Sequence, residues 1–192
     1  VRARSAALAV AGPVIGKAAE LTNAGWRLDG AALMAALQLE QGLLLNDFEA
    51  LAACLPALGR ADILPIVEGL PAPEGARLVL GPGTGFGAAA LFGRAGRHVI
   101  APTEAGHMEL GPATEDESAL WPFIERVHGR VTIESVLSGS GLARLDAALR
   151  LRQGGAAVLG GGFEVAEAAE AGEPFALAAV QLFGCLMGRV AG

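Results

Sequence analysis

A glycine-rich loop is the most distinctive group of residues with possible chemistry in this 192-residue sequence. Residues 81–87 read GPGTGFG and follow residues 77–80, which we predict to be a strand. The alternating glycines Gly83 and Gly85 allow backbone N–H groups to approach an anion closely, and Thr84 adds a hydroxyl. The pattern is typical of a phosphate-binding turn, although a tight hairpin without a ligand has the same composition.

The loop also matches the relaxed dinucleotide-binding pattern GxGxxA at Gly83, Gly85 and Ala88. A Rossmann unit requires a full helix after its glycines, whereas only residues 88–92 separate this loop from the next turn. A P-loop is excluded as well, because the pair Gly16-Lys17 lacks the upstream glycine that this motif needs. We therefore predict that strands flank the glycine loop on both sides.

A second candidate group is the pair Asn46 and Asp47. The pair follows the apolar run 43–45, which we predict to be a buried strand, and precedes the helical run 48–58. A carboxylate at such a strand end would be partly desolvated and could act as a base. Capping of the following helix by Asn46 or Asp47 explains the pair equally well.

A third candidate group is Glu104 and His107, which lie three residues apart beside Gly106. A carboxylate accepts hydrogen bonds and an imidazole donates or accepts them, so the pair suits a ligand rich in hydroxyls. A local structural bond between the two side chains is the alternative. No hydrolase triad follows, because Ser138 and Ser140 lie in SGSG, which is not the nucleophile pattern GxSxG.

The elements that must position these residues are predicted from apolar runs, caps and turn signals. We expect a hairpin of residues 5–10 with 18–22, and further strands at 43–45, 63–67, 77–80, 88–92 and 98–101. We expect helices at 31–39 with Asp29 as cap, at 48–58, from the Thr114 cap to Val127, from Thr132, at 142–151, at 164–170, and from Pro174 to Gly192.

The composition limits the possible partners. The net charge of −6 disfavours nucleic acid, because phosphate backbones are bound by clustered Lys and Arg. No apolar run reaches the ~20 residues of a membrane-spanning helix, and residues 175–190 are predicted to be a buried helix. Cys54 and Cys185 are predicted to be buried free thiols, and no protein metal site is predicted. We expect a soluble, cytoplasmic protein.

Six segments, in this order, resemble the bacterial glucokinase family. They are AGPV (11–14), LTNAGW (21–26), LLNDFEA (44–50), GPGTGFGAA (81–89), EAGH (104–107) and ESVLSGSGL (134–142). The resemblance implies an α/β fold of the actin-like, ribonuclease-H-like ATPase type, with two lobes around a sugar and ATP cleft. Residues 1–57 would belong to the small lobe and residues 58–192 to the large lobe.

The resemblance also implies roles for the candidate residues. The protein would phosphorylate the 6-hydroxyl of glucose with ATP and Mg²⁺, and Asp47 would take the proton from that hydroxyl. The sugar would be bound by Asn46, Asp47, Glu104, His107 and Glu134, and the nucleotide phosphates would face Gly83, Thr84 and Gly85. A homodimer is the expected assembly.

Two departures from the family pattern lead to alternatives. The first phosphate loop of the family, Asp-x-Gly-Gly-Thr, is missing, and so is the later adenosine segment, so we expect a chain that is incomplete at both ends. A non-catalytic sugar-binding module and a kinase for another hexose are the alternatives. The related group with a cysteine-rich zinc motif is a poorer match, because the chain has only two cysteines.

Overall fold

The computed structural model describes residues 3–21, 24–67, 75–94, 97–157 and 160–192. The chain divides into two compact units. Unit 1 comprises Val1–Val79 and Ala89–Pro102, and unit 2 comprises Leu80–Ala88 and Thr103–Gly192. The chain therefore passes from one unit to the other more than once, and the candidate residues are divided between them.

Unit 1 contains a parallel pair of strands, β1 (Ser5–Val10) and β5 (Gln41–Asn46), whose register runs from Ser5↔Gln41 to Val10↔Asn46. The predicted hairpin of residues 5–10 with 18–22 is wrong. Strand β3 (Ala18–Glu20) instead pairs antiparallel with β2 (Val14–Ile15) and with β4 (Arg27–Asp29), while Thr22 lies outside the described residues. The turn signals after β1 were misleading, because β1 pairs with β5, which lies much further along the chain.

The α-helices that the structure describes in unit 1 start at side-chain caps. Asp29 precedes α1 (Gly30–Ala36), and its Oδ1 accepts hydrogen bonds from the N–H groups of Ala31 at 2.9 Å and Ala32 at 3.1 Å, as predicted. Helix α2 (Asp47–Cys54) follows β5 directly, which confirms the strand–helix order around Asn46 and Asp47. It ends before the predicted residue 58, in the 3₁₀ turn Leu55–Ala57, because Pro56 has no N–H to continue the helix.

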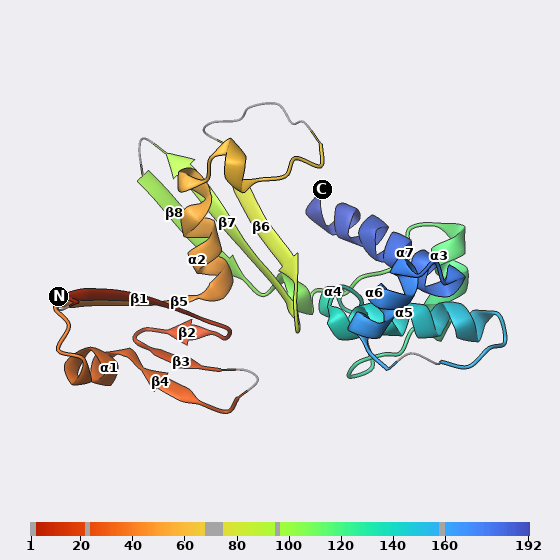
Figure 1. Cartoon of the computed structure of the whole chain (residues 1–192), viewed down its shortest axis with the longest axis horizontal. Coiled ribbons are helices and arrows are strands. Elements are labelled where there is room, and N and C mark those ends of the chain that lie inside the picture. The colour runs from red at the N-terminus through yellow and green to blue at the C-terminus, as the bar shows by residue number, and fades with distance from the viewer. Residues whose placement is uncertain (1–2, 22–23, 68–74, 95–96, 158–159) are drawn as a thin grey trace. The chain divides into compact units, whose positions relative to one another are not determined.

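A three-stranded sheet carries the glycine loop. Its strands are β6 (Arg77–Pro82), β7 (Phe86–Arg94) and β8 (Arg97–Thr103), in the order β6-β7-β8 (Figure 1). Strand β7 begins directly after the loop, so the prediction of strands on both sides is confirmed. The strand predicted at 63–67 is wrong, since this segment forms no strand around Pro65, which lacks a donor for a sheet ladder.

Unit 2 is mainly helical (Figure 1). Its helices are α3 (Glu115–Leu120), α4 (Ile133–Val136), α5 (Gly139–Arg152), α6 (Gly162–Glu170) and α7 (Pro174–Ala191). Helix α3 is shorter than predicted because Pro122 lies in the 3₁₀ turn Trp121–Phe123 that follows it. One apolar cluster joins these helices to the start of β7, with Phe86, Val136, Leu145, Val165 and Leu186 among its members.

A buried ion pair fixes α5 to the start of α7. Arg150 donates to both oxygens of Asp146, at 2.7 and 2.9 Å, and to Glu173 at 2.7 Å. The hydrogen bonds with Asp146 raise the pKa of Arg150, so the guanidinium stays charged. The carboxylate of Asp146, which is 1% exposed, is therefore buried with its charge compensated.

Helix α7 is long and apolar enough, by length and composition, to cross a membrane. That is weak evidence, because core helices pass the same test. Here α7 packs against α5 and α6 and buries Ala176, Ala179 and Leu186. Its opposite face is exposed, so the helix is buried on one side only. Cys185 lies on the exposed side and Cys54 is exposed as well, so the prediction of buried thiols is wrong.

Candidate functional site

The glycine loop is held at its base and open above Gly83. The Gly83 N–H donates to the carbonyl of Gly85 at 2.8 Å, and the Gly139 N–H, at the start of α5, donates to the carbonyl of Gly83 at 3.0 Å. A Cβ built on Gly83 would have no atom within 4 Å apart from those of its chain neighbours. The side of Gly83 on which a Cβ would lie therefore has room for a ligand group, while the Gly83 N–H itself is already bonded within the loop.

Glu134 contacts the far end of the glycine loop. It lies on α4 and is half-buried, and its Oε2 accepts a hydrogen bond from the Phe86 N–H at 3.0 Å. A Cβ on Gly85 would collide with the same carboxylate oxygen, so only glycine fits there without movement. The residue predicted to bind the sugar thus touches the loop predicted to bind the phosphates.

Glu104 precedes, and His107 ends, a turn that packs against the same part of β7. The turn is the 3₁₀ helix Ala105–His107, and a Cβ on its buried Gly106 would lie 2.6 Å from the carbonyl oxygen of Phe86. Oε2 of Glu104 lies 3.9 Å from Nε2 of His107, and their side chains are 78% and 72% exposed. Both side chains can therefore reach a ligand, because neither is held in a buried bond.

Two backbone hydrogen bonds tie the segment after His107 to the start of α4. The Ile133 N–H donates to the Met108 carbonyl at 2.9 Å, and the Leu110 N–H donates to the Val131 carbonyl at 3.0 Å. Three of the predicted sugar ligands, Glu104, His107 and Glu134, are therefore brought together with the glycine loop within unit 2.

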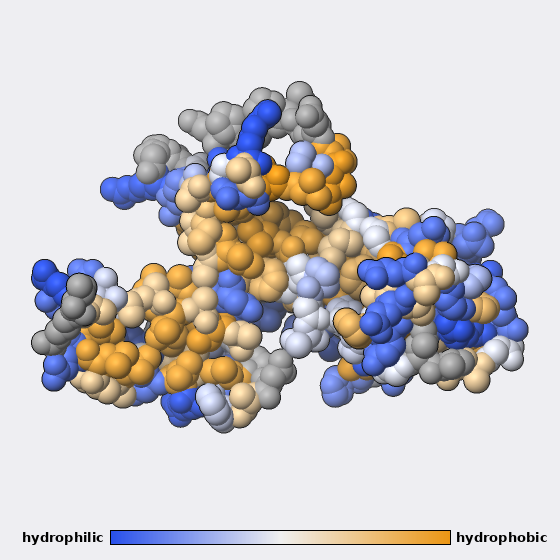
Figure 2. Space-filling model, in the orientation of Figure 1, coloured by the Kyte–Doolittle hydropathy of each residue, from blue (hydrophilic) through white to orange (hydrophobic). Residues whose placement is uncertain are grey.

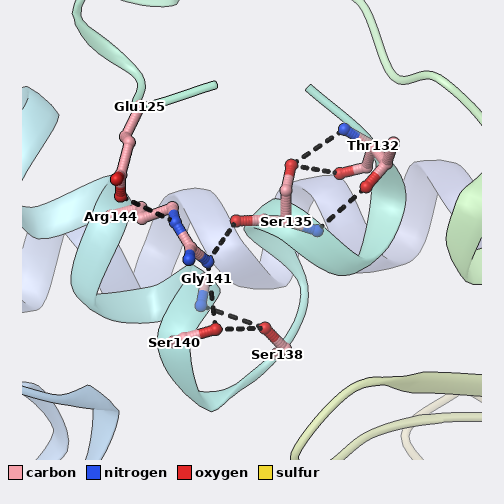
Figure 3. Close-up of polar contacts among 7 residues, drawn as sticks. All are labelled: Glu125, Thr132, Ser135, Ser138, Ser140, Gly141 and Arg144. Atoms are coloured by element: carbon pink, nitrogen blue, oxygen red, sulfur yellow. Dashed lines mark hydrogen bonds and ion pairs between the residues drawn. The ribbon is translucent and has the colours of Figure 1, made fainter. Parts of the chain in front are cut away.

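Figure 3 shows the contacts that fix α4. Ser135 and its cap Thr132 form a reciprocal capping box: the Ser135 N–H donates to Thr132 Oγ1 at 3.3 Å, and the Thr132 N–H donates to Ser135 Oγ at 2.8 Å. Arg144 on α5 donates from Nη1 to the Ser135 carbonyl at 3.3 Å and to Ser140 Oγ at 3.0 Å, and from Nε to Glu125 at 3.0 Å. The short helix that carries Glu134 is thus held at both ends.

Asn46 and Asp47 lie in unit 1, at the junction of β5 and α2. Asn46 caps α2, since its Oδ1 accepts from the N–H groups of Phe48 at 3.0 Å and Glu49 at 3.3 Å, and its Nδ2 donates to the Gly12 carbonyl at 3.2 Å. The capping alternative is therefore correct for Asn46, and its contact with a sugar stays a prediction. Asp47 is half-buried, and its Oδ1 accepts from the Phe48 N–H at 2.9 Å.

Sequence reasoning missed the residues that support the site. Phe86 contributes a backbone N–H and a carbonyl oxygen, and no pattern of side chains reveals either. Arg144 carried no motif, although its spacing of four residues from Ser140 was a signal that helix geometry could have used. Among the described residues, no group of three or more His, Cys, Asp or Glu side chains is arranged to hold a metal ion.

Comparisons with known proteins point to one family. A family model described as Glucokinase matches residues 1–192. The glucokinase of Sinorhizobium medicae is 42% identical over 193 residues, and the match covers 100% of this chain and 57% of that protein. The chain thus spans a little over half the length of the curated relatives it matches.

Two solved structures resemble the chain as well. A glucokinase from an Antarctic psychrotroph aligns with a TM-score of 0.83 and 32% identity, covering 95% of this chain and 57% of that one. A glucokinase from Balamuthia mandrillaris in complex with glucose aligns with a TM-score of 0.73 and 21% identity, covering 97% and 59%, and at that identity it supports the fold alone. The α/β arrangement described above is therefore that of glucokinases.

Proposed function

This chain belongs to the glucokinase family, and we propose that the whole protein phosphorylates glucose at its 6-hydroxyl with ATP as the donor. The observation that carries the proposal is the contact between Glu134 and the glycine loop. It joins a group suited to sugar hydroxyls to a loop suited to phosphates.

Asp47 is the general base in this proposal. As the 6-oxygen of the sugar attacks the γ-phosphorus of ATP, an O–P bond forms, the bond from the γ-phosphorus to the leaving oxygen of ADP breaks, and the hydroxyl proton passes to Asp47. Its half-buried position at the start of α2 fits this role, because one of its oxygens is held by the Phe48 N–H and its direction is thereby fixed.

The other predicted sugar ligands supply selectivity. Asn46, Glu104, His107 and Glu134 would share the remaining hydroxyls, and a sugar with a different stereochemistry would leave some of these polar groups unpaired. The open face of Gly83 supports binding of the ATP phosphates by Gly83, Thr84 and Gly85. Mg²⁺ would arrive with those phosphates and offset their charge.

The proposal extends to features of the whole protein. The family fold would place residues 1–57 in a small lobe and residues 58–192 in a large lobe of an ATPase-type architecture. We further propose a homodimer in the cytoplasm. These assignments rest on the family alone.

A coupled assay of ADP release with the full-length protein tests the proposal. We expect glucose to give the highest kcat/KM among glucose, mannose and N-acetylglucosamine. A higher value for another sugar would identify a kinase for that hexose. Calorimetry separates the remaining alternative, because binding of glucose with neither ATP binding nor ADP release would identify a non-catalytic sugar-binding module.

A further inference from the structure

We propose that Glu134 positions the glycine loop, so that one carboxylate serves the sugar site and sets the shape of the phosphate site. The inference rests on the proposed function and deepens it, because it makes the affinity for ATP depend on a residue of the sugar site. Glu134 acts on ATP through the loop and does not touch the reacting atoms.

The first support is the hydrogen bond at the end of the loop. Oε2 of Glu134 accepts the Phe86 N–H at 3.0 Å, across 48 residues of sequence. Phe86 is the first residue of β7, so this bond fixes the point at which the loop joins the sheet. Hydrogen bonds to a charged acceptor are stronger than those between neutral groups, so the carboxylate is an effective anchor.

The second support is the close fit between Glu134 and two glycines. The carboxylate occupies the space in which a Cβ of Gly85 would lie, and the Cβ of Glu134 lies 3.4 Å from the place of a Cβ on Gly106. Gly83, in the same loop, has no atom within 4 Å of such a position apart from those of its chain neighbours. The loop therefore rests on Glu134 at one glycine and is open at the other.

The third support is the rigidity of the base on which Glu134 stands. The capping box of Thr132 and Ser135 holds one end of α4, and Arg144 holds the carbonyl of Ser135 (Figure 3). A carboxylate on a fixed backbone can transmit a change in its own orientation to the loop it contacts. On a mobile backbone, the same change would move the helix and leave the loop in place.

The two oxygens of the carboxylate allow both contacts at once. Oε2 holds the Phe86 N–H, and Oε1 remains to accept a sugar hydroxyl. A sugar bound to Oε1 would restrict rotation of the carboxylate and so strengthen the bond to the loop. Because such coupling is reciprocal for binding, ATP bound to the loop would raise the affinity for the sugar by the same factor.

Amide hydrogen exchange at Phe86 tests the positioning directly. The full-length protein is measured without sugar or nucleotide. We expect the Phe86 amide to exchange at least about tenfold faster in Glu134→Ala than in wild type, because its charged hydrogen-bond acceptor is lost. Glu134→Gln should keep most of the protection, because its amide oxygen can still accept the Phe86 N–H. Equal exchange at Phe86 in wild type and Glu134→Ala would overturn the inference.

The KM values for glucose and for ATP provide a second test. Both substitutions should raise the KM for glucose, since both alter the sugar ligand, whereas the KM for ATP should rise clearly more in Glu134→Ala than in Glu134→Gln. A residue that only binds sugar would leave the KM for ATP equal in the two variants. That result would also contradict the inference.

A double-mutant cycle uses the two glycines as a matched pair. Gly85→Ala should raise the KM for ATP more in the wild-type background than in the Glu134→Ala background, because removing the carboxylate makes room for the new Cβ. The effect of Gly83→Ala should not depend on residue 134. If the effects of Gly85→Ala and Gly83→Ala on the KM for ATP depended equally on residue 134, the steric part of the inference would be overturned.

The exchange experiment separates this inference from the proposed function. It needs no substrate, so a wild-type protein that fails to phosphorylate glucose would contradict the proposed function while the exchange at Phe86 still tests the anchor. An active wild-type enzyme with unaltered exchange in Glu134→Ala would contradict the inference alone.

Discussion

Asp47 is the residue on which the proposed chemistry depends most directly. We expect Asp47→Asn to lower kcat for glucose by about 10²–10⁴-fold, with a smaller change in the KM for glucose. The amide has nearly the same size and can still accept the Phe48 N–H, but it cannot take up the proton of the sugar hydroxyl. Steady-state kinetics of the full-length enzyme measure both constants.

A matched control for Asp47 lies in the same unit. Asp29 is also an aspartate at the start of a helix, and Asn caps helices about as well as Asp. Asp29→Asn should therefore leave kcat within about twofold of wild type. Retention of most of the wild-type kcat by Asp47→Asn would show that another group accepts the proton.

The candidate residues were predictable from the sequence, but most of their contacts were not. The capping alternative at Asn46 was visible because a cap is defined by its neighbours in the chain. The bond between Glu134 and Phe86 joins residues 48 positions apart, and one partner contributes only its backbone. No pattern of residue types could have shown it.

Helices α3 and α7 are joined by an ion pair that makes their contact depend on pH. Glu117 accepts from Arg189 at 2.6 Å and from the Ala113 N–H at 2.7 Å, and its side chain is 12% exposed. Burial by itself would raise the pKa of Glu117, but the hydrogen bonds from Ala113 and Arg189 and the charge of Arg189 outweigh it. The pKa of Glu117 is therefore lowered on folding.

A lowered pKa stabilises the folded state above the ordinary pKa of a carboxyl group, and this contribution is lost as the pH falls through the folded value. We expect Glu117→Gln to reduce the free energy of unfolding by roughly 1.5–3 kcal/mol at pH 7, because a charged hydrogen-bond partner is lost. The difference from wild type should narrow as the pH falls from about 5 towards 3. Urea unfolding of the full-length protein at several pH values measures it.

Glu115 is the control for this prediction, because it lies in the same first turn of α3 and is exposed. Glu115→Gln should cost only ~0.3–1 kcal/mol, the size of an interaction with the helix dipole. A pH-independent difference between Glu117→Gln and wild type would mean that the ion pair does not act through protonation.

Elements were predicted well where their signals are local. The caps Asp29 and Thr132 and the first-turn Pro174 each mark a helix start in the structure. The partner of β1 was missed, because strand pairing depends on contacts between distant segments and local turn signals favoured a hairpin. Helix ends were also missed where proline interrupts the backbone hydrogen bonds, as at Pro122.

The two units of the molecule differ in how much apolar surface they bury. The main hydrophobic cluster lies wholly in unit 2, whereas the buried apolar residues that the structure describes in unit 1 are Ala19, Ala52, Ala89 and Leu91. Unit 1 also holds an apolar cavity of about 240 Å³, lined in part by Leu8, Leu33 and Met34. Figure 2 shows large apolar areas over β1, β5 and α1.

The sequence predicted the α/β class and the family, since both follow from motifs spread along the chain. It did not predict the division into units, because the boundary falls inside β7: Ala89–Pro102 belong to unit 1, whereas Phe86–Ala88 belong to unit 2. Alanine adds to the difficulty. It is the strongest helix former, yet it also fills strands such as β1 and β7, and its small side chain says little about the size of each core.

Unequal burial leads to a prediction about local stability. In this 192-residue chain, amides in α5 and α7 should exchange with solvent more slowly than those in β1 and β5, because opening unit 2 exposes its whole apolar cluster. Leu145→Ala, at a fully buried position, should cost about 2–5 kcal/mol and speed exchange across the helices of unit 2. Hydrogen exchange followed by mass spectrometry measures both effects.

Leu43→Ala makes the same change in unit 1, where Leu43 is 55% exposed. Its effect on exchange should be smaller, because a side chain that already faces water loses less transfer free energy and leaves no closed cavity. Exchange in β1 and β5 as slow as in α5 would show that unit 1 is stabilised by more than its own buried side chains. Stability would then be shared across the units, and Leu145→Ala should speed exchange in β1 and β5 as well.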